Sequence, residues 1–152
     1  MIEAGQKAPD VTILTMRGDE IRADAPGMPL VLYFYPKDDT PGCTTEAKDF
    51  SDHLASFEEA GARVVGVSRD SEAKHQKFID KHDLSVSLAS DEKGKISDAF
   101  GTWGLKKFMG REFMGMIRST FLIDREGMVV RAWPKVKVKG HVEEVLEAVK
   151  AL

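Results

Sequence analysis

The sequence predicts an α/β protein with a mixed central β-sheet flanked by helices, and three observations support this fold class. Two short apolar runs, 30–35 and 63–68, have the length and the β-branched and aromatic content of buried central strands. Each run is followed by a segment with helical periodicity, which indicates β-α-β-α order and parallel pairing. Segments 119–124 and 128–133 flank a short turn and predict an antiparallel hairpin. We expect residues 1–152 to form a single domain.

Turn and cap signals predict the remaining elements before the middle of the chain. Residues 11–15 and 20–22 flank a turn and predict an N-terminal β-hairpin, and 24–29 form a loop. The first long helix begins after Thr40 and ends near Gly61. Asp70 or Ser71 caps the helix that follows the second central strand.

The second half of the chain contains both clear and ambiguous patterns. A short strand is expected at 86–88, and helical spacing of apolar residues from Ile96 to Trp103 predicts a short helix. The final helix has one apolar face, formed by Val142, Val145, Leu146 and Val149. Lysines alternate with valines at 135–139, which indicates an edge strand protected from pairing, or alternatively a docking patch.

Residues 104–117 are rich in Gly, Met, Phe and Lys but show no clear periodicity. We interpret them as a long connection packed over the domain. Their apolar residues form either a rim near Cys43 or adaptable packing against the core, and they are Met109, Phe113, Met114 and Met116.

The composition excludes several classes of protein. A net charge of −3 and the absence of a basic cluster argue against nucleic acid or an anionic membrane as a partner. No apolar run approaches membrane-spanning length, and residues 1–7 lack the blocks of a signal peptide, so we expect a cytoplasmic protein. The only cysteine, Cys43, cannot form an intrachain disulfide, which suits a reducing compartment.

The stretch Pro36–Cys43 reads Pro-Lys-Asp-Asp-Thr-Pro-Gly-Cys and joins the first central strand to the first long helix. Thr40 can cap that helix and Pro41 fits its first position, so Cys43 lies in the first turn. A helix N-terminus stabilises an anion and favours the nucleophilic thiolate. A lone cysteine on an apolar stripe is alternatively a small hydrophobic residue, but the strand, turn and capped helix favour a reactive thiol.

The spacing Pro36-x-x-x-Thr40-x-x-Cys43 resembles the active-site signature of the peroxiredoxins, and this resemblance implies a thioredoxin-like fold. Segments 106–110, 118–124 and 133–141 resemble the bacterioferritin-comigratory (Bcp) or Q-type branch of the AhpC/TSA family. The resemblance implies reduction of hydrogen peroxide and organic hydroperoxides through a sulfenic acid on Cys43. It also implies an external thiol as reductant (thioredoxin, glutaredoxin or glutathione), no cofactor and a monomer.

The resemblance further implies roles for the residues around the sulfur. Cys43 is the peroxidatic nucleophile, Thr40 aligns its hydroxyl with sulfur and peroxide, and Arg118 places a guanidinium near both. Pro36 shields the site from water. Alternatively, Thr40 is a simple helix cap and Arg118 a solvated edge residue. Glu46, one turn after Cys43, either pairs with Arg118 or complements the helix dipole.

The other chemistry-bearing residues give weak patterns. His75 and His82 share a helix but are separated by about 10 Å, too far to share one metal, so we expect no metal site. The segment around Ser68 only half resembles a nucleophile elbow, and we interpret Ser68 and Asp70 as loop and cap.

The sequence also departs from the family it resembles. Many Q-type members carry a second cysteine at one of two positions, which here hold Lys48 and Leu84. The chain is therefore expected to be a one-cysteine peroxidase. A non-catalytic redox sensor that uses Cys43, and a structural module with an inert cysteine, are the alternatives; turnover of peroxide distinguishes the three.

Overall fold

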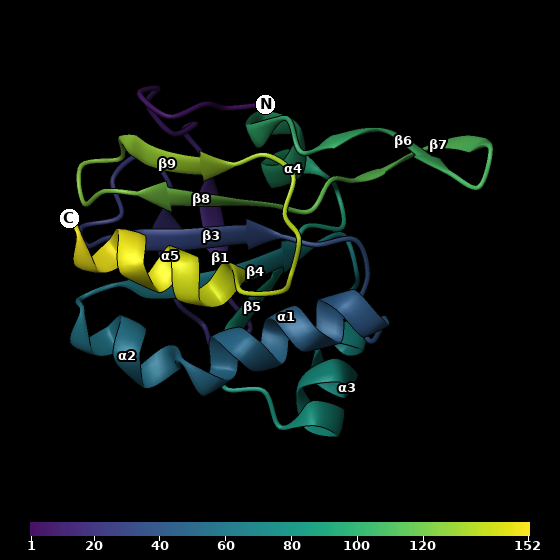
Figure 1. The fold of residues 1–152 in the computed structure, drawn as a ribbon, viewed down its shortest axis with the longest axis horizontal. Coiled ribbons are helices and arrows are strands. Elements are labelled where there is room, and N and C mark those ends of the chain that lie inside the picture. The colour runs from purple at the N-terminus through teal and green to yellow at the C-terminus, as the bar shows by residue number, and fades with distance from the viewer.

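The fold is built on a five-stranded mixed sheet in a computed structural model that describes residues 1–152 (Figure 1). The strand order is β5-β4-β3-β8-β9. The strands are β3 (Leu30–Phe34), β4 (Arg63–Ser68), β5 (Ser87–Ser90), β8 (Ser119–Ile123) and β9 (Val129–Trp133). β3, β4 and β5 are parallel, whereas β8 and β9 run antiparallel to their neighbours. The predicted mixed α/β sheet is confirmed.

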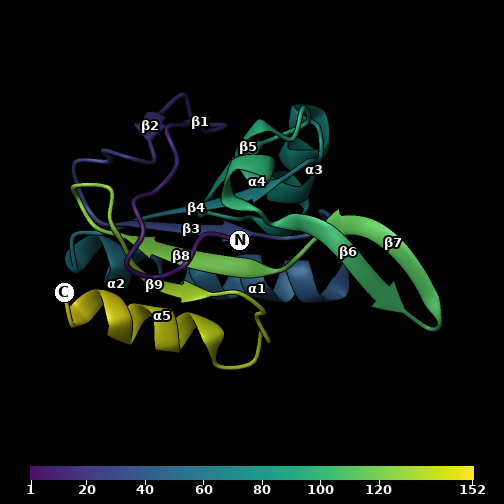
Figure 2. The ribbon, with the colours of Figure 1, turned by 90° about the horizontal axis from the view of Figure 1, so that it is seen from above.

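Helices and a small hairpin cover both faces of this sheet. The helices are α1 (Pro41–Asp52), α2 (Leu54–Glu59), α3 (Glu72–His82), α4 (Lys95–Phe100) and α5 (His141–Lys150). Figure 2 shows α1, α2 and α5 on one face and α4 on the other. The second face also carries the predicted N-terminal hairpin, formed by β1 (Thr12–Leu14) and β2 (Glu20–Arg22).

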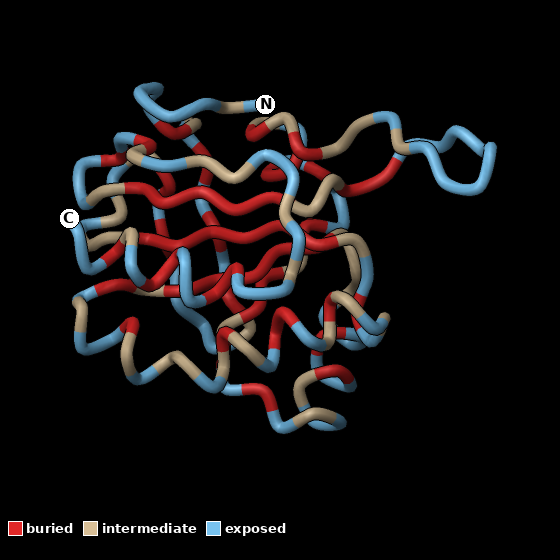
Figure 3. The backbone as a smooth tube through the Cα atoms, in the orientation of Figure 1, coloured by how far each residue is buried: buried red, intermediate tan, exposed pale blue.

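The central strand β3 supplies side chains to a hydrophobic core on each face. Successive strand residues point in opposite directions, so Val31 and Tyr33 join the core under α1, α2 and α5. Leu32 and Phe34 join the core on the other face. Figure 3 shows these central strands as buried along their length. The position where β3 ends is therefore fixed from both sides of the sheet.

Residues 104–117 do not pack over the domain, and this expectation is wrong. They form most of an antiparallel hairpin of β6 (Trp103–Phe108) and β7 (Arg111–Met116), which projects from the body of the molecule (Figures 1 and 3). Met109 and Gly110 make the turn, with φ of 50° and 77°. Met116 at the hairpin base is buried, whereas Met109 at its tip is 86% exposed.

Three smaller expectations also fail. The first long helix is interrupted at His53 and continues as α2. Trp103 begins β6 and is not part of α4, because Gly101 with φ of 74° ends that helix. Residues 135–139 form no strand; they follow Pro134, which cannot donate to a ladder, and lead into α5. No helix combines the length and apolar character needed to cross a bilayer.

Candidate active site

Cys43 lies in the first turn of α1, as the sequence predicts. Thr40 is at the N-cap position with extended backbone, Pro41 follows, and the N–H of Thr44 donates to the Thr40 carbonyl at 2.8 Å. The Cys43 residue is only 2% exposed and packs with Ala47 of the same helix in the core. The sulfur is therefore held at the positive end of a twelve-residue helix, where negative charge is stabilised.

Arg118 contacts this sulfur directly. β3 and β8 pair with Phe34 opposite Ser119, so the residue before β8 lies beside the loop that follows β3. Nη2 of Arg118 donates to Sγ of Cys43 at 3.2 Å. Gly42 leaves room for this contact, because a Cβ there would lie 3.1 Å from Nη2. Arg118 is not a solvated edge residue.

Glu46 completes a three-residue cluster with Arg118 and Cys43. Nη1 of Arg118 donates to Oε1 of Glu46 at 2.7 Å, and Glu46 is fully buried. Burial raises the pKa of Glu46 to about 7, although Arg118 acts in the opposite direction. Burial works against the charged form of Arg118, but the facing Cys43 and Glu46 raise its pKa above the usual value. The guanidinium of Arg118 thus donates hydrogen bonds to both Cys43 and Glu46.

Thr40 and Pro36 precede Cys43 in the chain. Thr40 does not cap α1 with its side chain: the hydroxyl donates to the carbonyl of Lys37 at 2.8 Å instead. Pro36 directly follows the buried Tyr35 and is half-buried. Both residues lie in the loop between β3 and α1, within a few residues of the sulfur.

Comparison with known proteins identifies the family of this chain. The AhpC/TSA family model matches residues 4–132, most of the chain. The chain belongs to the AhpC/TSA family. Peroxiredoxin Bcp of Bacillus subtilis is 53% identical over 150 residues, which cover 98% of this chain and 96% of that protein. The chain is thus a peroxiredoxin of the Bcp or Q-type branch.

Solved structures agree with this assignment. The bacterioferritin comigratory protein of Xanthomonas campestris, studied for its alkyl peroxide reduction activity, is 43% identical with a TM-score of 0.87, and 98% of each chain is covered. A mutant of PrxQ from Xylella fastidiosa is 37% identical with a TM-score of 0.90, and 99% of this chain and 97% of that chain are covered. The thioredoxin-like fold is confirmed.

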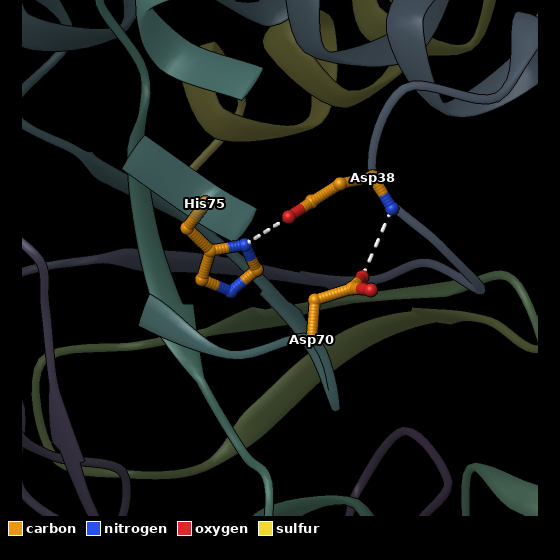
Figure 4. Close-up of side chains that lie close together, drawn as sticks. All are labelled: Asp38, Asp70 and His75. Atoms are coloured by element: carbon orange, nitrogen blue, oxygen red, sulfur yellow. Dashed lines mark hydrogen bonds and ion pairs between the residues drawn. The ribbon is translucent and has the colours of Figure 1, made fainter. Parts of the chain in front are cut away.

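The loop between β3 and α1 is held by a network of hydrogen bonds that the sequence did not predict, part of which is drawn in Figure 4. Asp38 accepts a hydrogen bond from the Tyr35 hydroxyl at 2.6 Å, and its Oδ2 lies 2.6 Å from Nδ1 of His75 on α3. The N–H of Asp38 donates to Asp70 at 2.9 Å. His75 Nε2 lies 3.0 Å from the carbonyl of Ala89. No periodicity or motif links a loop aspartate to a helix histidine 37 residues later.

Asp38, Asp70 and His75 also bring three potential metal-ligand atoms within 4.8 Å of one another. Each of these side chains is already hydrogen-bonded within the protein, so the arrangement acts to connect the loop to α3 and β5. Asp70 does not cap α3; its Oδ2 accepts from Ser68, and Ser71 is the cap. The interpretation of Asp70 as a cap is therefore wrong.

The two positions at which the resemblance to the Q-type branch suggested a second cysteine differ in their surroundings. Lys48 is exposed on α1, and Leu84 is 5% exposed and packs in the core just after α3. Cys43 is the only cysteine and is free. An intrachain disulfide is therefore impossible in this peroxiredoxin.

Proposed function

We propose that this peroxiredoxin is a thiol-dependent peroxidase that reduces hydrogen peroxide and organic hydroperoxides with Cys43 as the nucleophile. The observation that carries the proposal is the 3.2 Å hydrogen bond from Arg118 to Cys43 at the beginning of α1. A guanidinium and a helix N-terminus both favour the thiolate, which is the attacking form. Alkyl peroxide reduction by the X. campestris relative supports organic hydroperoxides as substrates.

In the proposed reaction the Cys43 thiolate attacks one peroxide oxygen in line with the O–O bond. A sulfur–oxygen bond forms, the O–O bond breaks, and the second oxygen leaves as an alkoxide or hydroxide that takes up a proton. Cys43 becomes a sulfenic acid and the peroxide becomes an alcohol or water. Negative charge moves from the sulfur to the leaving oxygen during this step. A fixed hydrogen-bond donor that faces both atoms therefore stabilises the transition state more than the ground state. Arg118 is the residue positioned for this role.

The surrounding residues have supporting roles in this proposal. Thr40 turns its hydroxyl from the Lys37 carbonyl toward the peroxide when substrate enters, and Pro36 limits access of water. Glu46 holds the guanidinium of Arg118 through their 2.7 Å ion pair. A carboxylate that orients an arginine preorganises the donors before the peroxide arrives.

The sulfenic acid requires a thiol from another molecule, because Cys43 is the only cysteine. We propose thioredoxin, glutaredoxin or glutathione as the reductant, a monomeric enzyme and a cytoplasmic location. A protein with no disulfide to form suits a reducing compartment.

Replacement of the sulfur tests the proposed function. Cys43→Ser should lose all thiol-dependent peroxide consumption, measured at steady state with a panel of thiols, while circular dichroism shows an unchanged fold. Lys48→Ser, on the exposed side of the same helix, is the matched control and should retain activity. Substantial activity in Cys43→Ser would refute the nucleophile assignment. Consumption of a single equivalent of peroxide per chain by the wild type would instead identify a redox sensor.

A further inference from the structure

A cleft of about 500 Å³ opens beside Arg118. It lies between Met1, residues 105–107 of β6, residues 117–118 and residues 134–136. Its volume is in the range of sites that hold small organic molecules. Its walls include Ile117, Pro134 and Val136, which offer apolar surface to the body of such a molecule.

The charges that line the cleft are all positive. Four cationic side chains contribute to the wall and no acidic residue does; they are Lys106, Lys107, Arg118 and Lys135. This is unexpected for a chain with a net charge of −3. Arg118 pairs with Glu46 and Lys107 pairs with Glu112, but Lys106 and Lys135 pair with no carboxylate. The cleft is therefore suited to a ligand that brings its own negative charge.

Cys43 is not part of the wall, but one wall residue contacts its sulfur and so connects it to the cleft. Arg118 lines it and also donates to Sγ of Cys43 at 3.2 Å. Lys106 packs its stem over Gly115, where a Cβ would lie 3.1 Å from its Cδ, and donates to the carbonyl of Met116 at 2.8 Å. Burial lowers the pKa of Lys106, and the charge of Arg118 lowers it further while Cys43 opposes this effect. Lys106 is thus close enough to Arg118 and Cys43 for their charges to influence its pKa.

We propose that this cleft binds the reductant of oxidised Cys43, and that the reductant is a low-molecular-weight thiol bearing carboxylates. The proposal rests on the proposed function, because it requires a sulfenic acid at Cys43. The sulfur is 2% exposed and is contacted by Arg118 of the cleft wall, so a small thiol bound in the cleft needs less opening of the site than a folded protein would. Glutathione has the size and the carboxylates that the cleft selects.

The chemistry of this step uses two thiols. The thiolate of the first attacks the sulfenic sulfur, a disulfide bond forms, the sulfur–oxygen bond breaks, and hydroxide leaves with a proton as water. A second thiol attacks the sulfur of the bound thiol and releases Cys43 as a thiolate. Two thiols are oxidised to one disulfide, and Cys43 is reduced by two electrons. Cations around the cleft assist both the approach of the anionic thiol and the departure of hydroxide.

A series of small thiols that differ in charge tests the proposal. The protein is oxidised with one equivalent of hydrogen peroxide, and intact mass confirms one added oxygen before any thiol is present. Mercaptosuccinate, glutathione, 2-mercaptoethanol and cysteamine are then added separately, and the mixed disulfide is followed by quenched-flow mass spectrometry. Rate constants are expressed per thiolate, since the thiols differ in pKa. We expect the largest rate constant per thiolate for the anionic thiols, a smaller one for the neutral thiol and the smallest for the cationic thiol.

Variants of Lys135, an exposed residue in an irregular segment, connect this preference to the cleft. The ratio of the mercaptosuccinate to the 2-mercaptoethanol rate constant should fall roughly threefold in Lys135→Gln and further in Lys135→Glu, as expected for one exposed charge. Added salt should reduce the ratio in the wild type. Lys150→Gln, which makes the same charge change at the far end of α5 (Figure 1), is the control and should keep the wild-type ratio.

Two results would overturn the proposal. One is equal rate constants per thiolate for anionic and neutral thiols; the other is an anion preference that Lys135→Glu leaves intact. Failure to gain an oxygen at the first step would contradict the proposed peroxidase function itself, so the two failures are distinguishable.

Discussion

At the scale of single residues, the candidate site depends on Arg118. Its planar guanidinium donates one nitrogen to the sulfur of Cys43 and another to the carboxylate of Glu46. A lysine ammonium is a compact point charge on a flexible stem and cannot reproduce this fork. Arg118 therefore provides both a positive charge beside the sulfur and a hydrogen-bond donor in a fixed direction. A lysine would provide the charge without the fixed direction.

Substitution of Arg118 should reveal both functions. Arg118→Met should slow the oxidation of Cys43 by peroxide about 100-fold or more, the usual effect of removing a preorganised donor. Arg118→Lys keeps the charge but loses the geometry, and should be intermediate. Stopped-flow fluorescence during peroxide addition measures the rate, with Arg131→Lys on β9 as the control. Wild-type rates in Arg118→Met would remove the arginine from the mechanism.

The buried Glu46 gives the protein a pH-dependent stability of defined sign. The pKa of its carboxyl is about 7 in the folded protein, against an ordinary value of 4.5, because burial disfavours the charged form. Between these values the folded protein binds a proton that the unfolded chain has released. The contribution of Glu46 is thus fully present below pH 4.5 and is lost as the pH rises through 7.

Glu46→Gln should remove this dependence. The free energy of unfolding of the wild type, minus that of Glu46→Gln, should fall by about 3 kcal/mol as the pH rises from 4.5 to 8. Urea denaturation at a series of pH values measures both proteins. A difference that is constant or that rises with pH would show that Arg118 keeps the carboxylate ionised throughout.

At the scale of secondary-structure elements, local signals decided what the sequence could predict. β3 and β4 were predictable because continuous apolar runs are typical of strands buried on both faces, and α1 because Thr40 and Pro41 mark a helix start. The β6–β7 hairpin was not predictable, because most of it is exposed on both faces and so lacks the alternation of a half-buried strand. Its turn also carries an unusual residue.

That residue is Met109, which has φ of 50° at the first central position of a two-residue turn. Such hairpin turns, with positive φ at both central residues, favour Asn, Asp or Gly at this position, so Met109-Gly110 gives only half of the usual turn signal. A methionine in this conformation has a steric cost that Gly avoids and that Asn and Asp reduce.

Met109→Asn should therefore stabilise the hairpin. We expect the local free energy of opening to rise by about 1 kcal/mol, seen as roughly fivefold slower hydrogen exchange at the β6–β7 amides. Met109→Ala keeps a Cβ but has no side chain to bond the turn, and serves as the control. Equal exchange in the Asn and Ala variants would mean that positive φ at this position costs nothing.

At the scale of the whole molecule, the active-site loop is fixed by contacts between distant parts of the chain. Asp38 in the loop is hydrogen-bonded to His75 on α3 and to Asp70 after β4 (Figure 4). His75 in turn contacts the carbonyl of Ala89 in β5. Pairs of this kind depend on the packed fold and leave no pattern in the sequence. The position of Cys43 in the first turn of α1 was predictable from its local context, whereas the network that holds the adjoining loop was not.

The active-site loop should determine what happens to oxidised Cys43 when no thiol is available. No other cysteine exists in the chain, so a disulfide can form only with Cys43 of a second molecule. Cys43 is 2% exposed, and two such sulfurs cannot meet unless the first turn of α1 opens. One equivalent of peroxide should therefore yield a monomeric sulfenic acid, and excess peroxide a sulfinic acid.

Release of the loop should change that outcome. Asp38→Asn removes the charge that faces His75 and weakens the attachment of the loop to α3, so the first turn of α1 should open more often. Intact-mass spectrometry and non-reducing gels after one equivalent of peroxide then compare the variants. The wild type should remain mainly monomeric, and Asp38→Asn should form more disulfide-linked dimer; Asp98→Asn, on the exposed side of α4, is the control. A quantitative dimer in the wild type would show that burial does not protect the sulfur, and would indicate an intermolecular resolving mechanism in which a second copy supplies the thiol.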